Sequence, residues 1–234
     1  MDSSKYRLAI DGDYLECHYW GLFIKDQFPS YESFWLKFVV PLTNRPTDIH
    51  FKNNLELAKI GKSESDICIA QLNYSILRHL IRCFEIRKVI GSSSWIDQFD
   101  LILEGMTRLV GCHDIAFELL DRLANPIDYK AFDVESGKKA QIKRQKDNKG
   151  PFELIRRYRN NLVHGRLPPS IMDGSKLCLP AIGKESQYLD WRKTTDFNNP
   201  EREKYKKDFF HVSDILENAW NETIGYLEKN WKSL

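Results

Sequence analysis

The residues best suited to chemistry lie within ten consecutive positions, 156–165, which read Arg-Arg-Tyr-Arg-Asn-Asn-Leu-Val-His-Gly. A histidine titrates near neutral pH and can therefore accept and donate a proton during a reaction. An arginine is permanently charged, and its forked guanidinium matches the oxygens of a phosphate group. Arg159 and His164 together are suited to proton transfer beside a bound phosphate, and the amide of Asn160 can position the histidine or the phosphate.

The spacing of an arginine and a histidine five residues apart occurs three times in the chain, as Arg45 with His50, Arg108 with His113, and Arg159 with His164. The first pair contains Pro46 and lies outside any predicted helix. His113 falls on the apolar stripe of a predicted helix, where a core histidine is expected. The third pair differs from the others, because polar Asn160 follows its arginine and it ends a short helix.

The third pair resembles the R-x4-H motif of the HEPN superfamily, helical domains that often act as metal-independent RNA-cutting enzymes. The resemblance covers six residues as a motif and 64–232 as an architecture. It implies an endoribonuclease in which His164 is the general acid and base, Arg159 stabilises the phosphate and Asn160 positions them. One branch of the family has a tyrosine two residues after the histidine, where this chain has Arg166.

The same resemblance implies biological expectations that the residues do not supply. It implies a homodimer that acts on RNA in bacterial stress, as a toxin, or in phage defence, and it adds a cognate antitoxin or other partner protein. No cofactor is expected. The alternative is a catalytically silent HEPN-like module that binds a nucleotide, RNA or a partner protein.

Two interpretations of the motif residues remain open. In the first, Arg159 and His164 act together, although residues five apart on an ideal helix diverge by about 140°. The long arginine then wraps back, or two copies of the chain pair to build one cleft. In the second, Arg156, Arg157 and Arg159 only solvate the helix end, and His164 interacts with the helix dipole.

A basic segment leads into this motif. Positions 138–159 hold nine basic residues and two acidic ones, a net charge of +7 in a chain whose total is +2. Such a concentration of charge attracts a polyanion. We therefore expect the segment to guide RNA through six residues, namely Lys138, Lys139, Lys143, Arg144, Arg156 and Arg157. The alternative is a solvated loop that only keeps the protein in solution.

The elements that must position these residues are four helices. Apolar side chains recur at steps of three and four over 64–89, 95–124 and 212–232, and a shorter pattern, packed through Ile155, Tyr158 and Leu162, covers 151–164. Pro151 stands where a first-turn proline belongs. A short strand is predicted at 176–181 within the long connection of 170–210.

This pattern predicts a mainly all-α protein, an antiparallel four-helix-type bundle with a long inserted loop, and it leaves open one short strand pair. We expect two parts: an irregular N-terminal extension, residues 1–60, packed on the bundle, and the HEPN-like bundle itself, residues 61–234.

Composition narrows the remaining classes. The five cysteines form no C-x-x-C pair, and the six histidines have no partner at metal-ligand spacing, so no metal site is predicted. No apolar run approaches the roughly 18 residues that span a bilayer. The first residues lack a basic start followed by an apolar stretch, so no secretion signal is predicted. These features favour a cytoplasmic protein without a membrane partner.

Overall fold

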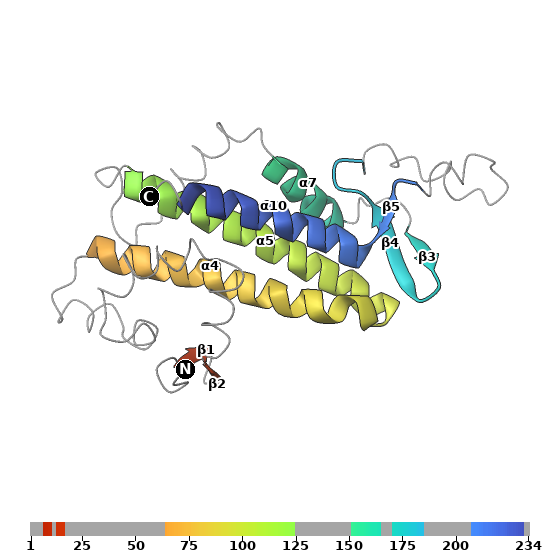
Figure 1. The fold of residues 1–234 in the computed structure, drawn as a ribbon, viewed down its shortest axis with the longest axis horizontal. Helices are drawn as coiled ribbons and strands as arrows, with labels where there is room; N and C mark the ends of the chain where they lie inside the picture. Colours follow the sequence, from red (N-terminus) through yellow and green to blue (C-terminus); the bar gives the residue numbers. More distant parts are fainter. Residues whose placement is uncertain are drawn as a thin grey trace. The chain divides into compact units, whose positions relative to one another are not determined.

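The computed structural model of the chain describes residues 7–10, 13–16, 64–124, 151–164, 170–184 and 207–231 (Figure 1). The chain divides into two compact units. The first comprises 1–77, 114–146 and 224–234, and the second comprises 78–113 and 147–223. The second unit holds most of the described residues, including the predicted site on helix α7.

Four helices account for most of the described residues, as the apolar periodicity predicts. They are α4 (Glu64–Val89), α5 (Trp95–Ala124), α7 (Pro151–Val163) and α10 (Val212–Trp231). A short 3-10 helix, η5 (Ile90–Ser92), separates α4 from α5. No helix in the described part of the chain is long and apolar enough to cross a membrane.

The start of α5 is fixed by a capping interaction. The Ser94 hydroxyl accepts a hydrogen bond from the Asp97 backbone N–H at 3.3 Å and donates one to the Asp97 carboxylate at 2.6 Å. This reciprocal arrangement satisfies a backbone donor that the first helical turn would otherwise leave unpaired. Within the second unit, α5 then lies beside α4, where Arg82 contacts Glu104.

Within the second unit, α4, α5 and α10 pack through matched side chains. Arg82 on α4 donates two hydrogen bonds to the Glu104 carboxylate on α5, both at 2.9 Å. Arg87 reaches the Glu217 carboxylate on α10 at 2.7 Å, and its guanidinium lies 4.5 Å from the ring centre of Trp220. The contacts are accompanied by a buried apolar core that includes Ile86, Ile102, Met106, Leu109, Leu216 and Trp220.

The apolar spacing over 95–124 predicts a core stripe on α5, and the structure differs from it in part. The predicted members are Phe99, Leu103, Met106, Val110, His113, Phe117 and Leu120. Met106, Val110 and His113 are buried as predicted, whereas Phe99, Leu103, Phe117 and Leu120 are only half-buried. Their places in the core are taken by Ile102, Leu109, Cys112, Ala116 and Leu119. The helix has partners on more than one side, so one stripe at helical spacing underestimates its buried face.

A three-stranded antiparallel sheet completes the second unit. Its order is β3 (Ile171–Asp173), β4 (Lys176–Pro180), β5 (Phe209–His211). The predicted strand at 176–181 is confirmed as β4. Its neighbours β3 and β5, and the sheet that the three strands form, were not predicted. Gly174, with φ of +60°, makes the tight turn that pairs Asp173 with Lys176. β5 leads directly into α10 (Figure 1).

The first unit contains a separate two-stranded sheet. β1 (Arg7–Ile10) and β2 (Asp13–Glu16) are antiparallel, with Arg7 opposite Glu16 and Ile10 opposite Asp13. The expected irregular extension therefore includes a short β-ladder. The rest of 1–60 lies outside the described residues.

Candidate functional site

Helix α7 presents the predicted site, and its apolar stripe determines which side chains face outward. Phe152, Ile155, Tyr158 and Leu162 are buried, in agreement with the three positions that the sequence predicts. The Tyr158 hydroxyl donates a hydrogen bond to the Pro180 carbonyl at 2.9 Å, which fixes α7 against β4. Because these residues occupy one side of the helix, the charged residues between them are directed to its remaining surface.

The three predicted catalytic residues lie at the C-terminal end of α7. His164 is exposed and directly follows the last helical residue, Val163. Its backbone N–H donates a hydrogen bond to the Asn160 carbonyl at 3.0 Å, so the helical hydrogen-bond pattern extends to His164. Arg159 and Asn160 are both half-buried.

Arg159 carries the most unusual feature of this end. Its Nε atom is buried and has no hydrogen-bond partner within the described part of the chain. A buried donor on a charged group is destabilising unless something accepts its hydrogen. No hydrogen bond or ion pair between described residues joins Arg159 to His164, as the angular separation of residues five apart on a helix leads one to expect.

The expected RNA-guiding residues divide into two groups. Arg157 is exposed and Arg156 is half-buried, both on α7. Lys138, Lys139, Lys143 and Arg144 lie outside the described residues, as does the alternative pair Arg45 and His50.

In the other competing pair, Arg108 with His113, the histidine belongs to the core and the arginine is half-buried. His113 is 2% exposed, and its ring stacks on Phe152 with 3.5 Å between the ring centres. Arg108 donates a hydrogen bond to Glu104 one helical turn earlier, at 3.2 Å. The prediction that His113 is a core histidine is confirmed.

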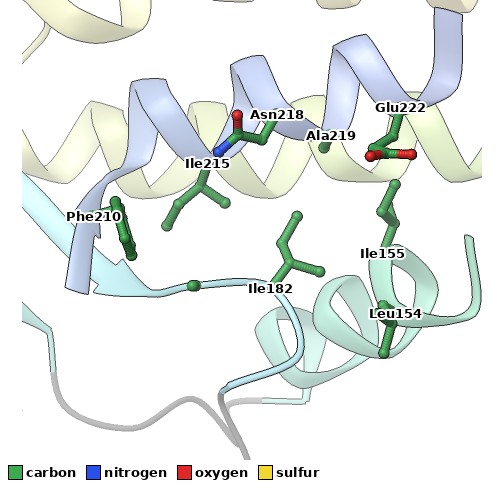
Figure 2. A pocket seen from close by; sticks show the side chains of 9 residues that line it. Leu154, Ile155, Ile182, Phe210, Ile215, Asn218, Ala219 and Glu222 are labelled. Carbon is green, nitrogen blue, oxygen red and sulfur yellow. The ribbon is translucent and has the colours of Figure 1, made fainter. Parts of the chain in front are cut away.

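A pocket of about 280 Å³ opens on another side of α7. Its lining is mainly apolar and comes from α7, the turn after β4, β5 and α10, through Leu154, Ile155, Ala181, Ile182, Phe210, Ile215 and Ala219, with Asn218 and Glu222 as polar members. Figure 2 shows the Glu222 carboxylate on α10 above Ile155. The sequence did not indicate this pocket, because its lining residues are distributed over four separate elements.

A cluster that sequence reasoning missed lies on the three-stranded sheet. The Cys178 sulfur is 3.3 Å from Nδ1 of His211, and Nε2 of the same ring is 3.4 Å from Oδ2 of Asp173. Cys178 and His211 are 33 residues apart, so no local spacing connects them. The predicted strand at 176–181 was the available signal, since it contains Cys178. Across the described residues, no three His, Cys, Asp or Glu side chains form a group that could hold a metal ion.

Comparisons of the whole chain with protein-family models, curated proteins and solved structures find no match.

Proposed function

We propose that the protein is a metal-independent endoribonuclease of the HEPN type, with its site at the C-terminal end of α7. The observation that carries the proposal is the half-buried Arg159, whose Nε has no partner among described residues, near an exposed histidine on the same helix end. A phosphate oxygen is the natural acceptor for such a donor, because a guanidinium binds phosphate through charge-assisted hydrogen bonds.

The proposed reaction uses each residue according to its chemistry. His164 removes the proton from a 2′-hydroxyl of RNA, and the resulting oxygen attacks the adjacent phosphorus. Arg159 neutralises the charge that develops on the pentacovalent phosphate. His164, now protonated, gives that proton to the departing 5′-oxygen, and the products are a cyclic 2′,3′-phosphate and a 5′-hydroxyl end. Asn160 positions the histidine or the phosphate, and Arg156, Arg157 and the 138–144 residues guide RNA to the site.

We further infer how the site is completed. Since Arg159 and His164 diverge on α7, one chain brings its arginine and another its histidine to a shared cleft in a homodimer. The four helices α4, α5, α7 and α10 would then form the antiparallel four-helix-type bundle of this superfamily. The expected setting is the bacterial cytoplasm, in stress or phage defence, with an antitoxin or another protein partner.

One observation favours a second candidate function. In the described part of the chain, no hydrogen bond connects Arg159 with His164, so a single chain holds an arginine without the paired histidine. A non-catalytic HEPN-like module that binds a nucleotide, RNA or a partner protein needs the arginine alone. Such a module would bind RNA with strong salt dependence and leave it intact.

The deciding experiment is incubation of purified protein with total RNA in excess EDTA. The nuclease proposal expects cleavage to persist, with cyclic phosphate ends on the products, and to disappear in Arg159→Ala and His164→Ala. Binding without cleavage in the wild type supports the silent module. Cleavage that EDTA removes and magnesium or manganese restores contradicts the metal-independent mechanism.

A further inference from the structure

The three-stranded sheet brings a thiol, an imidazole and a carboxylate into one line. Cys178 on β4 and His211 on β5 are direct cross-strand partners, and Asp173 ends the neighbouring strand β3. The contacts run from the Cys178 sulfur to Nδ1 of His211 and from Nε2 to the Asp173 carboxylate. One imidazole thus contacts the thiol with one nitrogen and the carboxylate with the other.

This order of groups is one that nucleophilic catalysis uses. When the neutral imidazole carries its proton on Nε2, beside the carboxylate of Asp173, Nδ1 is the nitrogen that can accept the thiol hydrogen. A base that contacts the nucleophile and is itself oriented by a third group defines a catalytic triad, whatever the fold that carries it. The helical site on α7 uses none of these three residues.

The state of the sulfur explains why the imidazole is needed. Burial, and then the carboxylates of Asp173 and Asp214, raise the pKa of the Cys178 thiol, while Lys176 opposes them. The sulfur therefore keeps its proton near neutral pH, and it gains nucleophilic character only as a base removes that proton. His211 is the base in contact with it.

We propose that Cys178, His211 and Asp173 form a second active site that accepts a small apolar acyl group from an activated ester. The sulfur attacks the carbonyl carbon and forms an S–C bond while its proton passes to Nδ1 of His211. The C–O bond to the leaving group then breaks, and the leaving oxygen takes that proton. Water afterwards hydrolyses the thioester, releasing the carboxylic acid and restoring the thiol.

The sheet register specifies the substrate class. Side chains alternate between faces along a strand, so Cys178 and Pro180 on β4 share one face of the sheet. Ile171, the Cα partner of Cys178 on β3, and Phe209, the Cα partner of Pro180 on β5, lie on the same face. These neighbours are apolar, and Cys178 is only 7% exposed. An uncharged hydrocarbon acyl group therefore matches this setting better than a charged one. The partly exposed His211 and the exposed Asp173 are the polar side of the cluster, with side chains 27% and 74% exposed.

The test uses the full-length protein and p-nitrophenyl butyrate. We expect a burst of about one nitrophenolate per chain, with the butyryl group located on Cys178 by peptide mass spectrometry. Cys178→Ser should abolish the burst, and His211→Ala should lower the acylation rate at least tenfold. Circular dichroism spectra of each variant check that the helices are intact.

Asp173 provides a variant that does not depend on the folding of the sheet core, because its side chain is mostly exposed. Asp173→Asn should slow acylation severalfold, because the imidazole loses the carboxylate that orients it. Met172→Ala, an exposed neighbour on β3, is the matched control and should react like the wild type. The proposal would be overturned if the wild type gave no larger burst than Cys178→Ser, or if the acyl group were found on another residue. A wild-type acylation rate in folded His211→Ala would also overturn it.

Discussion

Two histidines with an arginine five positions before them have opposite environments, which shows how little the motif alone determines. His164 is exposed just beyond α7, whereas His113 is buried in α5 against the ring of Phe152. An exposed imidazole can exchange protons with a substrate, and a stacked, buried one mainly contributes packing. Burial therefore separates the candidate site from its competitor at the level of single residues.

The first prediction concerns this pair. His164→Ala should abolish RNA cleavage and reduce the free energy of unfolding by only about 0.3–1 kcal/mol, the scale of a helix-dipole interaction. His113→Ala should lower the free energy of unfolding by about 1–3 kcal/mol, and each folded molecule should retain residual RNA cleavage. Urea denaturation and a cleavage assay on both variants measure this. Full cleavage in His164→Ala with a folded but inactive His113→Ala would assign the site to α5.

His79 gives a second prediction, on the pH dependence of stability. Burial, with the charges of Arg108 and Arg78, lowers the pKa of His79 to about 4 from 6.5. Between pH 6.5 and about 4, His79 therefore binds a proton in the unfolded chain but not in the folded one. The resulting contribution to stability is fully present above pH 6.5 and is lost as the pH falls towards about 4.

Replacing His79 with glutamine should remove this contribution. The stability of the wild type should fall more steeply between pH 6.5 and 4 than that of His79→Gln, as measured by urea denaturation at a series of pH values. The same substitution at exposed His164 is the matched control. Parallel curves for the wild type and His79→Gln would show that the folded protein accommodates the charged imidazole.

At the level of elements, the helices could be predicted closely, whereas only β4 of the three-stranded sheet could be predicted. The expected ranges 64–89, 95–124, 151–164 and 212–232 match α4, α5, α7 and α10 to within a residue or so. Helical periodicity is local and repeats several times in each segment, which explains this agreement. β3 and β5 have three residues each, too few for an alternating pattern, and their pairing depends on distant residues.

The candidate site divides in the same way. The sequence alone identifies Arg159, Asn160 and His164 by residue type and spacing, and it predicts their place at a helix end. The burial of the Arg159 Nε and the Cys178–His211–Asp173 contacts follow from tertiary packing, which a local pattern does not encode. Whether the α7 residues act on RNA stays a prediction.

The contact between α5 and α10 supports a third prediction. A Cβ atom added at Gly105 would lie 2.7 Å from a methyl carbon of Leu216, which is fully buried and has little room to turn away. Gly105→Ala should therefore cost about 1–3 kcal/mol of stability from overpacking, partly offset by about 1 kcal/mol of helix propensity. Adding Leu216→Val should relieve part of the strain, as a double-mutant cycle would measure.

Gly225 is the matched control for this substitution. It lies on the exposed face of α10, and an added Cβ would meet nothing within 4 Å. Gly225→Ala should therefore raise the free energy of unfolding by about 0.5–1 kcal/mol. If Gly105→Ala stabilised the protein equally, Leu216 would not pack against Gly105 as described.

For the whole molecule, the distribution of charge matters more than its total. The net charge is +2, yet positions 138–159 carry +7, so the rest of the chain carries −5. A polyanion is therefore attracted towards one segment and repelled by the remainder. RNA binding should depend on where a positive charge is removed as well as on how many are removed.

The last prediction tests this asymmetry by replacing Lys138, Lys139, Lys143 and Arg144 together with alanine. RNA affinity should fall, and the slope of log affinity against log salt should flatten by about 0.7 for each lost phosphate contact with single strands. The control removes four exposed lysines elsewhere, at Lys176, Lys184, Lys207 and Lys229, and so changes the net charge equally. Fluorescence anisotropy with a labelled RNA at several salt concentrations compares the two. The first variant should lose the larger part of the slope, because counterion release requires charges at the binding surface. Equal slopes in both variants would mean that the 138–144 residues act only through net charge, and the basic segment would then be a solubilising surface.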